Sequence, residues 1–160
     1  YVLTNIDIAL QPHFYKFITS YIKKHSQHNI IINRRNNVPK FRQIKNKRNE
    51  LVKVRISAEP QDLKFLFKQK GEQHPGNDCF VINETSLRKI RMGDLYTSFG
   101  PWGQILHRLL NHISPNKVTK MKDKYLTFHI GKDNPRDKKS LNFLNLQNRI
   151  NGDKIKERFK

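Results

Sequence analysis

The clearest structural pattern of this sequence is the stretch GPWGQILHRLLNHISP, which occupies residues 100–115. Its large apolar side chains recur every three or four residues, at Trp102, Ile105, Leu106, Leu109, Leu110 and Ile113. This spacing places them on one face of an α-helix, and Pro115 marks where that helix ends. Because an amphipathic helix buries its apolar face, we expect residues 102–113 to pack against a core.

Two segments nearer the N-terminus have an equally regular pattern. Residues 12–24 repeat the helical spacing and predict a second amphipathic helix. Residues 51–57 alternate instead, which predicts a half-buried strand with a basic outer face. Its apolar side would carry Val52, Val54 and Ile56, and its basic side Lys53 and Arg55.

Shorter patterns complete the expected secondary structure. Apolar or alternating runs predict strands at residues 28–33, 79–82 and 125–130. Further helices are expected at residues 60–70, 84–92 and 138–150. The first of these would bury Leu63, Leu66 and Phe67, and the second would turn Leu87 and Ile90 inward. Residues 73–78 have the composition of a loop.

These elements predict an α+β fold with a small compact mixed core and extended basic arms. We divide the chain into three parts. Residues 1–49 hold an amphipathic helix, a short strand and a basic arm; residues 50–130 form a central α/β core; residues 131–160 form a basic C-terminal extension with a helix. Because the sequence starts at Tyr1 without an initiator methionine, we expect a processed or split product.

The charge of the chain is extreme and unevenly distributed. The formal net charge is +19, from 32 basic and 13 acidic side chains. Residues 1–49 carry +9 and residues 116–160 carry +8, whereas the central block carries only +2. Such a separation of charge indicates a polyanionic partner, and nucleic acid is the natural one because each neutralised phosphate releases counterions.

The candidate nucleic-acid contacts are the basic side chains of two stretches and of the strand at 51–57. Residues 34–48 are interpreted as an extended loop that orders on its partner, the alternative being a solvated linker. The second stretch runs through residues 117–139. The candidates are Arg34, Arg35, Lys40, Arg42, Lys45, Lys47, Arg48, Lys53, Arg55, Lys117, Lys120, Lys122, Lys124, Lys132, Arg136, Lys138 and Lys139.

The residues Gly100, Pro101, Trp102 and Gly103 have the form Gly-x-x-Gly directly before a helix. With the expected order helix, strand, strand, helix, Gly-x-x-Gly, helix, strand, the chain from Pro12 to Ile130 resembles the KH family in its bacterial arrangement. The resemblance is to the KH-bearing protein of the small ribosomal subunit, and it implies that this loop clamps the phosphates of single-stranded RNA. The chain departs from the family in having proline and tryptophan between the glycines. The alternative is that Gly100 and Pro101 cap a core helix.

A small body with long basic arms also resembles ribosomal proteins as a class. Residue types with AT-rich codons, such as Ile, Asn and Lys, far outnumber those with GC-rich codons, and Ala9 and Ala58 are the only alanines. This bias indicates an AT-rich genome, typically that of an organelle, the alternative being an AT-rich nuclear genome. The resemblance implies a structural constituent of a mitochondrial ribosome, located in the matrix. Its partners would be rRNA and neighbouring ribosomal proteins, with no cofactor, small-molecule substrate, membrane span or catalysis.

Two alternatives from other classes stay open. Glu50 before the expected strand, with Asp62 and Lys64 after it, is a loose form of a metal-dependent nuclease or maturase-like site. The second alternative is a basic accessory subunit of a mitochondrial membrane complex. The seven scattered histidines and the single Cys79 predict neither a metal site nor a nucleophile.

Overall fold

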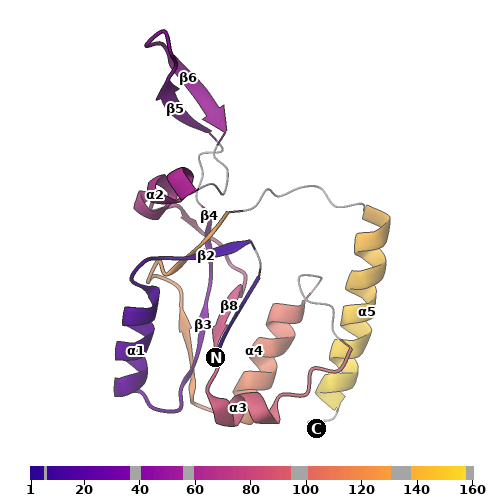
Figure 1. The fold of residues 1–160 in the computed structure, drawn as a ribbon. Helices are drawn as coiled ribbons and strands as arrows, with labels where there is room; N and C mark the ends of the chain where they lie inside the picture. Colours follow the sequence, from indigo (N-terminus) through magenta and orange to yellow (C-terminus); the bar gives the residue numbers. More distant parts are fainter. Residues whose placement is uncertain (6, 37–40, 56–59, 95–100, 131–137, 158–160) are drawn as a thin grey trace.

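A computed structural model describes residues 1–5, 7–36, 41–55, 60–94, 101–130 and 138–157 (Figure 1). The fold is α+β, as the sequence predicts. Its elements are β1 (Val2–Thr4), β2 (Ile8–Leu10), α1 (Phe14–Lys24), β3 (Asn29–Ile32), β4 (Arg35–Asn36), β5 (Phe41–Lys45), β6 (Leu51–Arg55), α2 (Pro60–Lys68), β7 (Glu72–Gln73), β8 (Cys79–Val81), α3 (Glu84–Lys89), α4 (Trp102–Ile113), β9 (Val118–Met121), β10 (Thr127–His129) and α5 (Lys138–Glu157).

Two four-stranded sheets are built from the same four segments of the chain. Each segment contributes one strand to the first sheet and another strand to the second. The first sheet has the order β1-β8-β3-β9 and the second has the order β2-β10-β4-β7. The segment with β1 and β2 therefore pairs with the β7–β8 segment in one sheet and with the β9–β10 segment in the other. The pairing thus closes into a ring of four segments, which holds together strands of only two to four residues.

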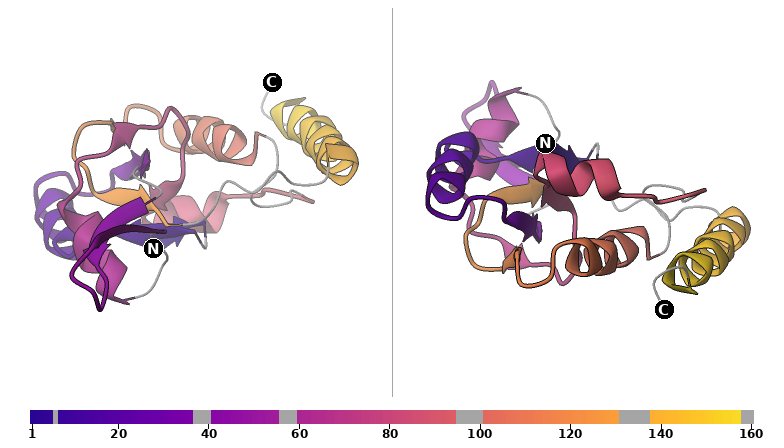
Figure 2. Two further views of the ribbon diagram at one scale, coloured as in Figure 1. Left: turned by 90° about the horizontal axis from the view of Figure 1, so that it is seen from above. Right: turned by 90° about the horizontal axis from the view of Figure 1, so that it is seen from below.

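Strand β3 is buried on both of its faces, and this decides where the helices pack. It runs antiparallel to β8 and parallel to β9. Ile30 and Ile32 contact the cluster around Phe14 of α1, whereas Ile31 contacts the cluster around Trp102 of α4. Successive side chains of a strand point to opposite faces, so a continuous run of isoleucine suits a strand covered on both sides. Figures 1 and 2 show α1 and α4 on opposite sides of β3 and β8.

The long C-terminal helix packs its last turns on α4. Ile155 joins Ile105 and Leu109 in a small cluster. Gly152 allows this approach, because a Cβ atom there would lie 2.5 Å from the Cδ1 atom of Ile105. These contacts explain why α5 continues to Glu157, beyond the end predicted at residue 150.

The bounds of helices α1 to α4 and of most strands with a regular pattern are confirmed within two to three residues, whereas α5 ends seven residues later than predicted. One predicted contact is wrong. Leu87 of α3 is 37% exposed, whereas Ser86 is buried. The N-terminus of α3 sets this orientation, because the Oδ1 atom of Asn83 accepts a hydrogen bond from the Ser86 N–H group at 2.8 Å. A buried Asn29 then donates to the Ser86 Oγ atom at 2.9 Å.

The basic arm at residues 34–48 is also not the loop that its composition predicts. Arg35 and Asn36 form β4, which pairs with β7 and β10. Residues 41–45 form β5, which pairs antiparallel with β6 as a hairpin. The alternating strand at 51–57 needed a partner, and the basic arm supplies it. Lys40 and Pro39 lie outside the described residues.

Strand β9 has no predicted counterpart, because in the sequence its residues stand out only as part of a basic stretch. Met121 of this strand is buried against the α1 side of β3, while Val118 packs on the α4 side. The strand depends on β3, about ninety residues earlier in the chain, and no local pattern predicts such a pairing.

We expect Ile31→Ala to lower the free energy of unfolding by about 2–5 kcal/mol, because it leaves a cavity between β3 and α4. Urea unfolding can be followed by the fluorescence of Trp102, which is only 5% exposed in the folded chain. Ile22→Ala is the control, since Ile22 is 40% exposed and its removal should cost less than about 1 kcal/mol. Equal losses for both variants would contradict the central position of β3.

Candidate nucleic-acid interface

The hairpin β5–β6 projects from the body beyond α2 (Figure 1). Residues paired across an antiparallel ladder lie on the same face. The register pairs Gln43 with Lys53 and Lys45 with Leu51, and Phe41 lies on the same face. All five of these side chains are exposed, Phe41 by 50% and Leu51 by 65%. One face of the hairpin therefore combines two lysines with an aromatic ring and an aliphatic side chain.

The turn of the hairpin is organised by Asn46. Its Oδ1 atom accepts hydrogen bonds from the N–H groups of Arg48 at 2.9 Å and Glu50 at 3.0 Å. Its Nδ2 atom donates to the Glu50 carboxylate at 2.8 Å. Asn49 takes a left-handed conformation with φ 62°, which asparagine tolerates well. The result is a defined turn that holds Lys47 and Arg48 exposed at the tip.

The opposite face of the hairpin is partly covered and is tied to α2. Val52 and Val54 are half-buried there. Arg42 on this face forms an ion pair of 2.5 Å with Asp62, whose side chain is only 3% exposed. Arg42 is thus committed to an internal contact and is not presented to a partner.

This ion pair also bears on the alternative of a nuclease site, since it places Asp62 away from Glu50. Asp62 contacts Arg42, which pairs with Val54, whereas Glu50 lies at the tip of the hairpin. Along the hairpin, Val54 and Glu50 are four residues apart, which corresponds to roughly 13 Å at 3.3 Å per residue. Within the described residues no group of three or more His, Cys, Asp or Glu side chains could hold a metal ion. The geometry therefore does not bring the nuclease residues together.

Two other candidate arginines also make internal contacts. The Nη1 atom of Arg34 lies 3.9 Å from the Oδ1 atom of Asp78, and both side chains are mostly buried. The Arg35 guanidinium lies over the Tyr125 ring, 5.8 Å from its centroid. These contacts stabilise the bends between β3 and β4 and between β9 and β10.

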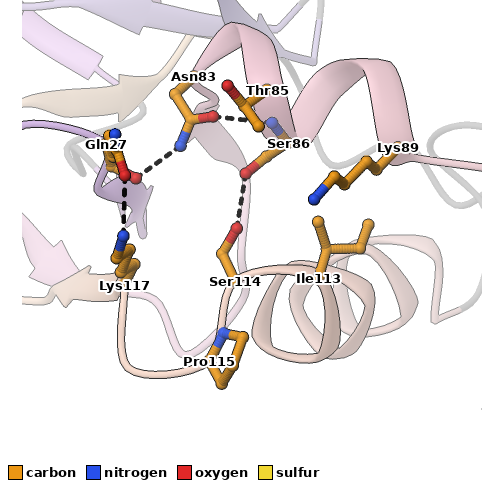
Figure 3. A pocket seen from close by; sticks show the side chains of 9 residues that line it. All are labelled: Gln27, Asn83, Thr85, Ser86, Lys89, Ile113, Ser114, Pro115 and Lys117. Carbon is orange, nitrogen blue, oxygen red and sulfur yellow. Dashed lines mark hydrogen bonds between the residues drawn. The ribbon is translucent and has the colours of Figure 1, made fainter.

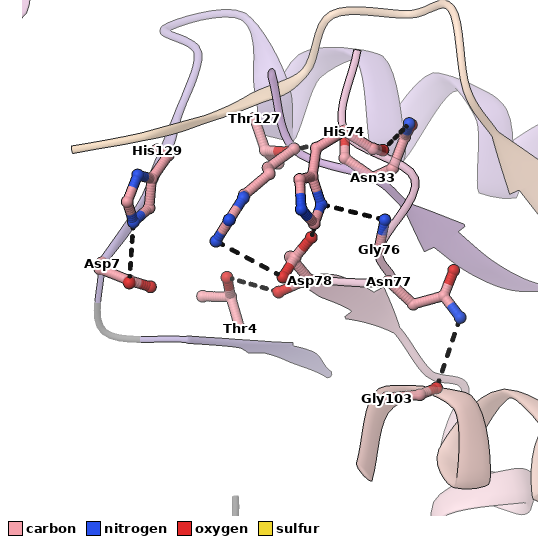
Figure 4. Close-up of polar contacts among 11 residues, drawn as sticks. Thr4, Asp7, Asn33, His74, Gly76, Asn77, Asp78, Gly103, Thr127 and His129 are labelled. Carbon is pink, nitrogen blue, oxygen red and sulfur yellow. Dashed lines mark hydrogen bonds and ion pairs between the residues drawn. The ribbon is translucent and has the colours of Figure 1, made fainter. Parts of the chain in front are cut away.

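Around Asp78 lies a polar cluster that the sequence analysis missed (Figure 4). The Gly76 N–H group donates to the Nδ1 atom of His74 at 3.0 Å, so this nitrogen acts as an acceptor. Asn33 donates to the His74 carbonyl at 2.7 Å, and Thr4 donates to the Asp78 carbonyl at 3.1 Å. The cluster links three of the four paired segments, which gives it a structural role. Its only sequence signal was the polar composition of residues 73–78.

The second basic stretch has a more mixed environment. Lys122 and Lys124 are exposed in the turn after β9, and the Lys117 ammonium donates to the Gln27 Oε1 atom at 2.8 Å. Lys120 is half-buried beside α4. There burial lowers the pKa of His107, and the charges of Lys120 and Arg108 lower that pKa further. Of the remaining candidates, Arg55 is the last residue of β6, and Lys138 and Lys139 are the first residues of α5. Lys132 and Arg136 lie outside the described residues.

Of the Gly-x-x-Gly residues, Trp102 and Gly103 make internal packing contacts, and Pro101 is half-buried directly before α4. Gly100 lies outside the described residues. Trp102 is buried and its ring centroid lies 5.7 Å from that of Phe80. A Cβ atom on Gly103 would lie 2.6 Å from the backbone oxygen of Asn77. The first turn of α4 is therefore pressed against the 73–78 loop, and Trp102 and Gly103 are not accessible to a phosphate group.

The single cysteine is also internal. Cys79 in β8 is fully buried, and burial, with a smaller contribution from the Asp78 charge, raises the pKa of its thiol to about 12. A thiol of this kind is a small apolar side chain and not a nucleophile at neutral pH.

Comparison with protein-family models, curated proteins and solved structures finds no match to this chain. Over the described residues, none of the helices combines the length and the apolar character needed to cross a membrane. The candidate site therefore stands on its own geometry. It is the hairpin face and tip, with Phe41, Lys45, Lys47, Arg48, Leu51 and Lys53.

We expect Gly103→Ala to lower the free energy of unfolding by about 1–3 kcal/mol, because the new methyl group meets a backbone oxygen. Gln104→Ala, an exposed change in the same turn, is the control. The RNA affinity of folded Gly103→Ala protein should stay unchanged. A variant with lower RNA affinity but unchanged stability would instead support the phosphate-binding loop that the resemblance to the KH family implies.

Proposed function

We propose that this protein is a structural constituent of a mitochondrial ribosome, which binds rRNA through basic arms and does not catalyse a reaction. The observation that carries the RNA-binding part is the exposed cationic face of the β5–β6 hairpin. In this view the first arm is not simply a disordered tail, because its residues 41–45 form one strand of a hairpin with a defined turn.

The chemistry of the hairpin suits folded RNA. Lys45, Lys47, Arg48 and Lys53 offer four exposed cations for phosphate oxygens. The only nearby acid in the turn, Glu50, is engaged by Asn46 at 2.8 Å. Exposed Phe41 adds a ring on which an unpaired base can stack, a contact worth about 1–3 kcal/mol in single-strand binders. Phosphate contacts would position the protein, and the stacked base would favour loops or bulges of RNA.

The assignment to a ribosome rests on the distribution of charge. Seventeen of the nineteen net positive charges belong to residues 1–49 and 116–160. A protein that only needed solubility would mix charges of both signs along its surface. The codon bias of the composition supports an organellar gene, and hence a mitochondrial ribosome.

The membrane-complex alternative differs from this proposal in the partner that the cations contact. If the cations faced acidic lipid or protein, RNA would not be needed to hold the chain in its assembly. The nuclease alternative has less support, because Asp62 is paired with Arg42 and Glu50 lies at the far end of the hairpin.

Replacing the four hairpin cations by glutamine should weaken RNA binding and reduce its dependence on salt. Each lost phosphate contact changes the slope of log K against log salt by about 0.7–0.9, so the combined variant of Lys45, Lys47, Arg48 and Lys53 should lose about 3 units of slope. Fluorescence anisotropy with an rRNA fragment measures this slope.

The control for that variant removes the same charge elsewhere. Lys16, Lys23, Lys24 and Lys154 are exposed on α1 and α5, and their replacement by glutamine should change the slope by less than half as much. Equal effects of the two variants would mean that RNA responds only to net charge, and the hairpin would lose its special role.

Sedimentation of an organelle lysate in magnesium tests the ribosomal assignment itself. We expect the protein to travel with a ribosomal-subunit-sized particle that RNase disperses. Migration with membranes that is indifferent to RNase would contradict the proposal and favour the membrane-complex alternative. A protein that stays at the top of the gradient would contradict both.

A further inference from the structure

A pocket of about 330 Å³ lies between α3, the end of α4 and the loop that leads into β9 (Figure 3). Ligand pockets usually span about 300–1,000 Å³, so this one suits a small ligand or one group of a larger one. Its polar wall includes Thr85, Ser114, Lys89 and Lys117. In Figure 3 the Lys89 side chain extends toward the space above Ser114 and Ile113.

The residues that line this pocket include two lysines and no carboxylate. The nearest acid along the chain, Glu84, is paired with Arg88 on the outer surface of α3. An ammonium group in such a wall lacks a negative partner within the pocket. The electrostatics therefore favour an anion there.

A chain of hydrogen bonds behind the pocket gives its wall a defined polarity. Asn29, which is fully buried, donates from its Nδ2 atom to the Ser86 Oγ atom at 2.9 Å. The Ser86 and Ser114 Oγ atoms lie 2.7 Å apart. Ser86 is only 1% exposed, so its own hydroxyl hydrogen needs a nearby acceptor, and Ser114 Oγ provides one.

This direction of donation leaves the Ser114 hydroxyl as an acceptor toward Ser86. Its own hydrogen can then point into the pocket, as a donor. Asn29 is held in this orientation because its Oδ1 atom accepts the Asn83 N–H group at 3.0 Å. The pocket thus offers a hydroxyl donor that is positioned by a buried amide, together with two ammonium groups, of which that of Lys117 also donates one hydrogen bond to the Gln27 Oε1 atom.

We propose that this pocket binds a phosphate group, with Lys89, Lys117 and Ser114 as its donors. Lysine binds phosphate as a mobile point charge, and hydroxyl donors complete the contacts to its oxygens. The phosphate comes from an RNA backbone or from a free nucleotide. That the phosphate belongs to an RNA backbone rests on the function proposed above, whereas the affinity of the pocket for phosphate does not depend on that function. Lys89 lies outside the basic stretches at residues 34–48 and 117–139.

The test of the pocket uses the full chain and inorganic phosphate as the probe. The melting temperature is measured in sodium phosphate and in sodium chloride of equal ionic strength. We expect phosphate to raise the melting temperature of the wild type and of the control Lys16→Gln/Lys154→Gln to the same extent. The pocket variant Lys89→Gln/Lys117→Gln should lose at least half of that rise.

Ser114→Ala keeps the net charge and tests the hydroxyl separately; it should also reduce the rise. If the pocket double variant does not fold, Lys89→Gln alone replaces it, since this side chain is exposed. Equal phosphate responses of the control and of all pocket variants would overturn the proposal.

A second measurement identifies the source of the phosphate. If RNA fills the pocket, the pocket variant should lose about 0.7–0.9 units more of the salt-dependence slope for RNA than the control does. If phosphate stabilises the chain through the pocket but the RNA slopes are equal, the pocket stands and its ligand is a free nucleotide. The proposed ribosomal function is judged independently by the sedimentation experiment.

Discussion

The burial of β3 on both faces is the constraint on which the rest of this structure depends. Ile30 and Ile32 pack toward α1, and Ile31 packs toward α4. Because β3 also pairs with β8 on one side and β9 on the other, it brings together segments from three distant parts of the chain. The positions of the hairpin and of the pocket, at the two ends of the body, both depend on this strand. The segment that follows it leads through β4 to the hairpin, and Asn29 at its start supports the phosphate pocket.

The few acidic residues decide which of the many cations belong to the body. Asp62 engages Arg42, and Asp78 lies beside Arg34. With 13 acids against 32 basic side chains, one-to-one pairing could reach fewer than half of the cations. Two of the acids thus hold arginines within the body, whereas the hairpin presents Lys45, Lys47, Arg48 and Lys53 at the surface. The charge of a segment alone does not distinguish these two uses.

The two cationic features lie at different ends of the molecule. Figure 1 shows the hairpin beyond α2 at one end and α3, which borders the pocket, at the other. A nucleic acid that contacted both would be held at two separated points, by exposed lysines on the hairpin and by donors within the pocket. Phosphate contacts position and orient a protein on its nucleic acid. Two separated contacts define that orientation better than one basic patch does, because a protein held at a single patch can still rotate about it.

The sequence by itself determined the α+β class, the helices α1 and α4, and the strands β3 and β8, because their apolar spacing is a local property that the core only has to accept. It also determined the excess and the uneven distribution of positive charge. Only the tertiary structure decided that residues 41–45 of the basic arm form one strand of a hairpin, since the partner strand β6 and the anchoring Asp62 lie outside the arm. The same holds for β9, for the buried positions of Trp102 and Gly103, and for the pocket, whose lining comes from three separate stretches between Gln27 and Lys117. Pairing and burial between distant residues depend on which surfaces meet, and a one-dimensional pattern does not contain that information.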